Sequence, residues 1–246
     1  MLESKNSWIN FREFIEVANN NCNWLVLRNF EYLPDDFFGN DKDVDVLCED
    51  LEGFVKIMKL KKIPFSTSNY ETVIDGKVVP FDIRFLGDGY YDKLWQYKML
   101  TNKIYTNRFV PRMNDKDYFY GLIYHSKIQK YEVKELYKKR LFELAKSLKI
   151  NSYQLNSIGD DKYLANLLSA FMNSNSYNYT STVDISVPKN LKFFKLLDDA
   201  VKNRIKASKE ILFISYMPSW LFILTPRFLK EIMKNSYYAV KKRRLK

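Results

Sequence analysis

The stretch Gly39–Asp50, GNDKDVDVLCED, organises the interpretation of this chain, because two carboxylates flank one valine where an apolar segment begins. Side chains alternate between the two faces of a β-strand, so Asp43 and Asp45 should share one face and Val44 and Val46 the other. Carboxylates at this spacing lie roughly 6.6 Å apart along a strand. They can bind one or two divalent cations separated by about 3.5–4 Å. The stretch therefore predicts a metal site on a strand, and the alternative is a solvated turn followed by an open sheet edge.

Composition limits the class of protein. The 246 residues are 46% hydrophobic and 16% aromatic with 7 glycines and 7 prolines, which is typical of a globular chain with a full-sized core. The net charge of +11 predicts an anionic partner: nucleic acid, a nucleotide or phosphorylated small molecule, or an anionic membrane surface. Cys22 and Cys48 lack a metal-binding spacing, no secretory signal pattern is visible, and no segment has the roughly 20 apolar residues of a spanning helix. We therefore expect a cytoplasmic protein with reduced thiols.

Upstream of the acidic stretch, hydrophobic periodicity predicts a helix and a strand. Residues 8–18 have the apolar spacing of an amphipathic helix, and Ser7 is a plausible N-cap. A continuous apolar run at residues 24–27 predicts a buried strand that stops at Arg28 and Asn29.

Downstream, residues 49–60 have helical periodicity, and a hairpin follows. The Asp75-Gly76 dipeptide separates two β-segments and tolerates the positive φ angles of a type I′ turn. The second arm of this hairpin runs through residues 81–85. Asp82 and Arg84 share one face of that arm, so a third carboxylate is expected on a regular β-segment.

This order of elements resembles the nucleotidyltransferase superfamily of the DNA polymerase β type. Members of that superfamily place two carboxylates on one strand and a third on a neighbouring strand, and bind two Mg²⁺ ions with them. The matching residues are Asp43 and Asp45 in KDVDVLC and Asp82 in PFDIRF, within a resemblance that covers about residues 8 to 90. It implies an α+β fold whose N-terminal part is a mixed β-sheet with flanking helices. It also implies Mg²⁺ as the cofactor, with Mn²⁺ as a substitute.

The chain departs from this superfamily after its first strand. Members usually have a Gly-Gly or Gly-Ser pair there, whose backbone amides approach a triphosphate. This chain has Arg28 and Asn29 at the same place. A guanidinium and an amide can bind phosphate by direct hydrogen bonds instead. Groups that transfer a phospho-alcohol from a CDP-linked donor to a glycan vary at the same place, but usually have consecutive aspartates where this chain has Asn40-Asp41-Lys42. The resemblance therefore extends to the superfamily and not to a subfamily.

The resemblance assigns roles to these residues in nucleotidyl or phosphoryl transfer, where Mg²⁺ needs hard oxygen ligands. Asp43 and Asp45 would bind or bridge the metals, and Asp82 would hold the acceptor-side metal and accept the hydroxyl proton. Arg84 would stabilise charge on the transferred phosphate, and the alternative is a salt bridge with Asp82. Arg28 and Asn29 are the candidate phosphate-binding pair.

Other polar residues are less specific. His125 is the only histidine, and with Lys127 and the nearby Lys130 it forms a candidate donor-binding cluster on a predicted helix. The alternative is that His125 is a packed or surface residue. Asp88 and Asp92 are expected to be turn or cap residues and not metal ligands.

The second half of the chain has helical periodicity from residue 115 onward. The apolar stripes cover residues 118–128, 133–148 and 162–172. Pro111 and Asn114 interrupt the pattern before them, which predicts a catalytic domain of residues 1–110 and a mainly α-helical domain of residues 111–246.

The end of the chain has two interpretations. Residues 211–224 are apolar and aromatic, and the basic sequence KKRRLK follows at residues 241–246. Such a combination is typical of an in-plane anchor on an anionic leaflet, so residues 211–246 predict peripheral contact with the inner face of a membrane. The alternative is a buried helix followed by a solvated, charged end.

The leading functional interpretation is a Mg²⁺-dependent transferase. It would move a nucleotidyl or phosphate-containing group from an activated nucleotide donor to a hydroxyl of a small molecule or glycan, in surface polysaccharide synthesis. One alternative is an RNA-directed nucleotidyltransferase, and another is a non-catalytic, basic nucleic-acid-binding protein on the same scaffold. No dedicated nucleic-acid module is recognisable, so nucleic acid is the less favoured partner.

Overall fold

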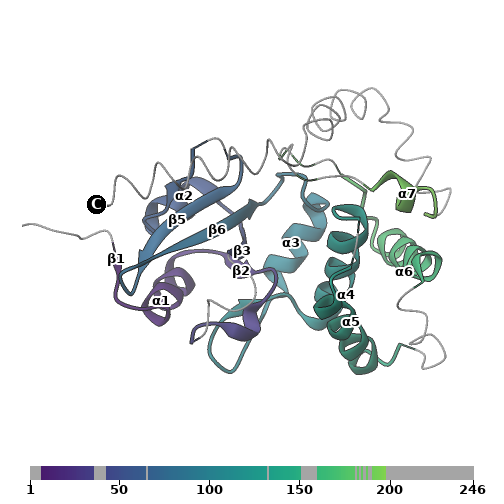
Figure 1. Cartoon of the computed structure of the whole chain (residues 1–246), viewed down its shortest axis with the longest axis horizontal. Coiled ribbons are helices and arrows are strands. Elements are labelled where there is room, and N and C mark those ends of the chain that lie inside the picture. The colour runs from purple at the N-terminus through teal and green to yellow at the C-terminus, as the bar shows by residue number, and fades with distance from the viewer. Residues whose placement is uncertain are drawn as a thin grey trace, which may run out of the picture.

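The fold is described here from a computed structural model (Figure 1). The structure describes residues 7–35, 43–64, 66–131, 133–150, 160–180 and 190–197, together with residues 182, 184 and 187. The predicted membrane-contact segment, residues 211–246, lies outside these residues. Within the part of the chain that the structure describes, no helix combines the length and apolarity needed to cross a bilayer.

A mixed β-sheet forms the N-terminal half, as predicted. In spatial order its strands are β1 (Ser7–Trp8), β5 (Asn69–Ile74), β6 (Lys77–Phe85), β3 (Val44–Cys48), β2 (Trp24–Val26), β8 (Pro111–Arg112) and β7 (Ile104–Tyr105), and β4 (Lys61–Lys62) pairs with β5. The pairs β1–β5, β3–β6 and β2–β8 are parallel, and the other pairs are antiparallel. Since β8 pairs with β2, the sheet includes residues on both sides of the domain boundary predicted after residue 110.

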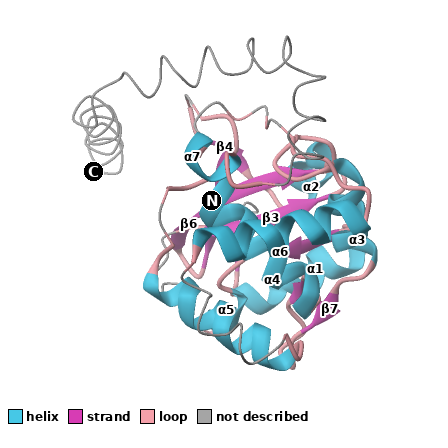
Figure 2. Cartoon of the chain, turned by 90° about the vertical axis from the view of Figure 1, so that its right-hand side faces the viewer, coloured by secondary structure: helices cyan, strands magenta, loops and turns pink. Residues whose placement is uncertain are grey.

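Helices lie on two sides of this sheet. They are α1 (Phe11–Asn21), α2 (Leu51–Ile57), α3 (Lys93–Thr101), α4 (Asp115–Ile123), α5 (Glu135–Ser147), α6 (Asp161–Ser174) and α7 (Leu191–Phe194), with a 3-10 turn, η1 (Phe30–Tyr32), and a π-helical turn, η2 (Tyr124–Ile128). Figure 1 shows α1 and α2 beside the long strands and α4, α5 and α6 grouped at the opposite side, with α3 between. In Figure 2 the second group lies in front of the strands. The predicted α+β class is confirmed.

One face of the sheet is an aromatic core against α1. Phe81 on β6 lies 6.5 Å from Phe11 and 5.1 Å from Phe14, measured between ring centroids. Neighbouring residues on a strand point to opposite faces, so the burial of Phe81 on this side directs Asp82 to the other side. Since Phe81 is the register partner of Val44, Asp45 on β3 is directed to that other side as well.

The predicted first helix begins later than expected. Ser7 and Trp8 form β1 and pair with β5, and Asn10 caps α1 by accepting a 2.9 Å hydrogen bond from the backbone N–H of Glu13. The prediction of Ser7 as N-cap is therefore wrong, because its backbone completes an edge of the sheet. Trp8 still packs on the helix, with its ring 5.6 Å from that of Phe14, so its apolar character fits both interpretations.

Other predicted elements are confirmed with shifted ends. The hairpin joins β5 to β6 through Asp75 and Gly76, whose φ angles of 51° and 67° are both positive, as a type I′ turn requires. The buried strand is β2, the helix predicted at residues 49–60 is the shorter α2, and the helix predicted at residues 162–172 is α6.

The aromatic core predicts a large loss of stability for Phe14→Ala. Phe14 is fully buried and contacts the rings of Trp8, Phe11, Trp24 and Phe81. We expect the free energy of unfolding in urea to fall by about 3–5 kcal/mol.

The matched control for this prediction is Ile9→Ala, since Ile9 is 76% exposed. It should change the free energy of unfolding by no more than about 0.5 kcal/mol. Equal losses in the two variants would contradict the packing described.

Candidate functional site

The parallel pairing of β3 with β6 brings two carboxylates side by side. Asp45 and Asp82 are register partners, and neighbouring strands lie about 4.8 Å apart. Asp43, two residues before Asp45, shares its strand parity. All three aspartates line one cleft of about 460 Å³. The structure therefore gathers the three carboxylates singled out from the sequence on the face of the sheet that does not pack against α1.

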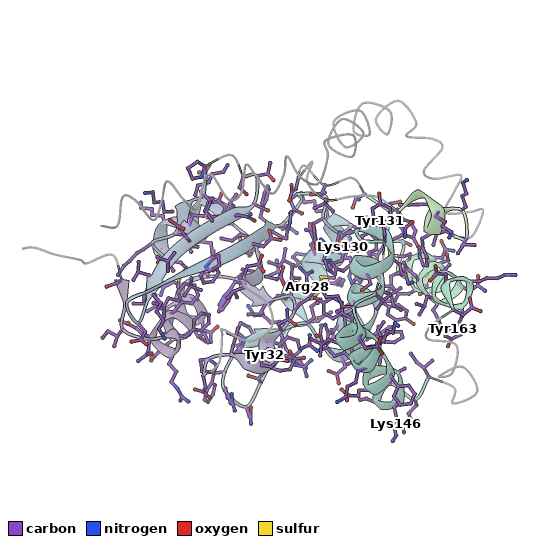
Figure 3. All side chains as sticks on the ribbon, in the orientation of Figure 1. Arg28, Tyr32, Lys130, Tyr131, Lys146 and Tyr163 are labelled. Carbon is purple, nitrogen blue, oxygen red and sulfur yellow. The ribbon has the colours of Figure 1, made fainter. Side chains whose placement is uncertain are left out.

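The opposite wall of this cleft comes from the helical half. It contains His125, Ser126, Gln129, Lys130, Tyr131, Lys134 and Tyr137. Figure 3 shows Arg28 between the strands and the helices, with Lys130 and Tyr131 on the helical side. The cleft thus lies where the sheet meets the segment from η2 to α5.

Arg28 holds the first carboxylate. The antiparallel pairing of β2 with β3 continues in a 2.8 Å bond from the Leu27 N–H to the Asp45 carbonyl, which brings Arg28 beside Asp45. The Arg28 Nη2 atom donates to Asp45 Oδ1 within an ion pair in which the Arg28 side chain is only 5% exposed. Burial raises the pKa of Asp45, Arg28 opposes this effect, and Asp82 and Asp43 add to it. The three carboxylates are therefore close enough to repel one another.

Arg84 holds the second carboxylate and ties a distant segment to it. Its Nη2 atom donates to Asp82 Oδ2 and its Nη1 atom to Asp184 Oδ2, both at 2.8 Å. Asp184 also accepts a 3.2 Å bond from the Ser68 hydroxyl. The Arg84 guanidinium lies 4.2 Å from the centre of the Tyr90 ring, at cation–π distance. The salt bridge with Asp82, one of two alternatives for Arg84, is thus present.

Tyr90 and His125 link the arginines to the helical wall. The Tyr90 hydroxyl accepts a 3.3 Å bond from Arg28 Nη1 and lies 3.0 Å from His125 Nδ1. Gln129 donates a 2.6 Å bond to the Tyr90 carbonyl. Burial lowers the pKa of His125 well below its usual value, and the nearby Arg28 lowers it further. His125 therefore lines the cleft as a neutral imidazole at pH 7.

Two residues predicted to bind phosphate do not line the cleft. The Asn29 side chain accepts a hydrogen bond from Arg140 on α5, and the Lys127 ammonium forms an ion pair with Asp161 on α6. Lys130, three residues after Lys127, lines the cleft instead. Asn29 therefore joins the end of β2 to α5, and Lys127 joins η2 to α6.

The acidic residues of the cleft fit a hard cation in chemistry, though they are not arranged around one. Magnesium prefers carboxylate oxygens, and Asp82 Oδ1 is buried without a hydrogen-bond partner among the described residues. Within the described part of the chain, however, no three His, Cys, Asp or Glu side chains surround a common metal position. Arg28 and Arg84 bind Asp45 and Asp82 instead. Each arginine pairs with one oxygen of its aspartate, so a metal at this position would bind the other oxygens or displace an arginine.

Sequence reasoning missed several residues of the site. Tyr90 was hidden in the turn sequence GDGYYDK, and Asp184 lies in a polar segment 100 residues after its partner Arg84. The spacing of Lys127 and Lys130 gave no signal that only one of them lines the cleft, because residues three apart share one face of a helix, and Lys130 lies beyond the end of η2.

The predicted turn and cap roles of two other aspartates are confirmed. Asp88 accepts a 2.8 Å bond from the Tyr90 N–H. Asp92 caps α3 by accepting bonds from the N–H groups of Leu94 and Trp95.

Comparison of the chain with protein-family models, with curated proteins and with solved structures finds no match. The site must therefore be interpreted from its own geometry and chemistry.

The burial of His125 predicts a pH dependence of stability. Its native pKa is depressed from the usual value of about 6.5, so below that pH the unfolded chain binds more protons than the native protein. The His125 contribution to stability is thus complete above about pH 6.5 and lost as the pH falls, by up to about 1.4 kcal/mol per pH unit.

The measurement is urea unfolding of wild type and His125→Gln at pH 7.5 and pH 5.5. The wild type should lose more stability over this interval than the variant. Identical losses, or ring resonances of this single histidine that titrate near pH 6.5 in the native protein, would contradict the burial described.

Proposed function

We propose that this protein is a Mg²⁺-dependent transferase that moves a nucleotidyl or phosphate-containing group from an activated nucleotide donor to a hydroxyl of a small molecule or glycan. The observation that carries the proposal is the cross-strand pair of Asp45 and Asp82, with Asp43 in the same cleft. These three carboxylates would hold the metal, which supplies positive charge to the donor phosphates and lowers the pKa of the acceptor hydroxyl.

The charge of the cleft supports joint binding of metal and donor. Its described lining contains four aspartates, two arginines and two lysines, and its histidine is neutral. These formal charges cancel, so the cleft alone has little net attraction for a polyphosphate. A divalent cation held by the carboxylates would make the cleft positive. We therefore expect the donor to bind much more tightly when Mg²⁺ is present.

The arginines have a role in this proposal. Arg84 is held over the Tyr90 ring and is directed into the cleft by two carboxylates. If Asp82 held a cation, the Nη2 atom of Arg84 could bind a phosphate oxygen while its Nη1 atom stays paired with Asp184. Arg28 stands in the same relation to Asp45.

The proposed setting is assembly of a surface polysaccharide on the inner face of a membrane. It rests on the aromatic segment and basic tail within residues 211–246 and on the net charge of +11. Both features belong to the sequence and not to the described structure.

A second function is favoured by the ion pairs themselves. Arg28 and Arg84 neutralise Asp45 and Asp82, so the site is electrostatically satisfied without a metal. Such a site suits a non-catalytic, basic protein that binds nucleic acid on the same scaffold. Metal titration separates the two functions.

The transferase proposal predicts stabilisation by Mg²⁺ or Mn²⁺ that depends on the aspartates. At a concentration 100-fold above the dissociation constant, a bound ligand stabilises the native state by about 2.7 kcal/mol. We expect thermal unfolding with donor nucleotide present to shift upward with metal in the wild type, and the shift to be lost in Asp45→Asn and Asp82→Asn.

The control is Asp75→Asn, the same substitution in the exposed hairpin turn. It should keep the full metal shift. Because Asp45→Asn also disturbs the Arg28 ion pair, the quantity compared is the metal-induced shift and not the unfolding temperature itself. Absence of any shift in the wild type would favour the non-catalytic function.

The donor can be identified from the product that leaves. Full-length protein and Mg²⁺ are incubated with nucleoside triphosphates and CDP-linked alcohols and a panel of hydroxyl acceptors, and the mixture is examined by mass spectrometry. Release of pyrophosphate indicates nucleotidyl transfer, and release of CMP indicates phospho-alcohol transfer. Release of neither, from any combination, would refute the transferase proposal, and Asp82→Asn serves as the inactive control.

A further inference from the structure

Lys130 differs from the arginines of the cleft in its partners. Arg28 is paired with Asp45, and Arg84 with Asp82 and Asp184. Lys130 lines the same cleft, but no described carboxylate forms an ion pair with it. Its positive charge is therefore available to a ligand.

The position of Lys130 is set by its backbone. It lies two residues after η2, and its carbonyl accepts a 3.3 Å bond from the Asn190 side chain, while the Asn190 N–H donates to the Ile128 carbonyl at 2.9 Å. The residue is exposed as a whole, yet partial burial lowers the pKa of its ammonium, Arg28 lowers it further, and Asp45 and Asp82 raise it. The ammonium is thus in electrostatic reach of the carboxylates on the opposite wall.

Tyr131, the next residue, lines the cleft and is 56% exposed. The ring of a tyrosine that is more than half exposed as a residue can stack against a nucleobase, a contact that every base can make. The cleft volume of about 460 Å³ is within the range of sites for small organic ligands, and is larger than a lone phosphate requires. Figure 3 shows Lys130 and Tyr131 together on the helical side, with Arg28 toward the sheet.

We infer that Lys130 and Tyr131 recognise the donor as a nucleotide: Lys130 binds its phosphate groups and Tyr131 stacks against its base. This inference rests on the proposed function for the identity of the site, and it specifies which residues bind the phosphate and base portions of the nucleotide donor. A cation next to an exposed aromatic ring matches the two chemically distinct parts of such a molecule. A sugar phosphate or a polyphosphate offers no base to the ring.

The chain offers a matched control for each residue. Lys127 lies three residues before Lys130, but its ammonium is paired with Asp161 and does not line the cleft. Tyr105 on β7 is 50% exposed, close to the 56% of Tyr131, but unlike Tyr131 it does not line the cleft. Lys127→Gln and Tyr105→Ala therefore remove the same chemical groups from positions where no effect on donor binding is expected.

The experiment is calorimetric titration of the full-length protein in Mg²⁺ with CDP, UDP, ADP, GDP and inorganic pyrophosphate. At least one nucleoside diphosphate should bind more tightly than pyrophosphate. Lys130→Gln should weaken the binding of the nucleoside diphosphate and of pyrophosphate by about tenfold or more, since a hydrogen bond to a charged group is lost. Lys130→Arg should restore much of the affinity. Tyr131→Ala should weaken nucleotide binding by at least about fivefold and leave pyrophosphate binding unchanged.

Several results would overturn the inference. One is pyrophosphate that binds as tightly as every nucleotide. Another is an equal effect on ligand binding of Lys127→Gln and Lys130→Gln, or of Tyr105→Ala and Tyr131→Ala. A third is an RNA oligomer that binds tightly and is not displaced by nucleotides. Failure of the proposed function is distinguishable. If the predicted binding pattern is found but no donor is turned over, the nucleotide site stands and the transferase does not. If transfer occurs with wild-type parameters in Lys130→Gln and Tyr131→Ala, the transferase stands and the inference fails.

Discussion

The side-by-side placement of the buried Asp45 and the partly buried Asp82 is the constraint on which the rest of this structure depends. The parallel register of β3 and β6 leaves no other position for the two carboxylates. Removing a charge from water costs several kcal/mol after relaxation, and a second like charge nearby adds to that cost. One guanidinium pairs with each carboxylate: Arg28, just after β2, pairs with Asp45, and Arg84, on β6, pairs with Asp82. An isolated pair of aspartates at this position would favour protonation or a change of register.

The two arginines in turn require the helical half. Both lie near the Tyr90 ring, whose hydroxyl lies beside His125 of η2, and Arg84 is held from its other side by Asp184. The sheet and the helices are therefore joined by a polar network as well as by apolar packing. The cleft lies within this network because the charged groups that need one another come from both halves of the chain.

This arrangement explains how one site could select a metal together with a donor. The described lining is balanced in charge, and carboxylates pair with Arg28 and Arg84 while no described carboxylate pairs with Lys130. In the proposed transferase, Asp45 and Asp82 would hold a cation, and their arginine partners could then turn guanidinium N–H groups to phosphate. The energetic cost of exchanging those ion pairs makes binding of the cation and of the anion interdependent.

Local patterns in the sequence determined which residues could form the site. Alternation in DVDVLC put Asp43 and Asp45 on one face, the Asp75-Gly76 turn produced the hairpin, and apolar spacing located the main helices, because each depends on residues a few positions apart. Only the tertiary structure decided that Asp82 lies opposite Asp45, and that Asp184 reaches Arg84 across 100 residues. It also decided that Lys130 faces the cleft while Lys127 pairs with a helix, and that Ser7 and Trp8 join the sheet. Register and long-range ion pairs depend on contacts between distant segments, and no local period in the sequence records them.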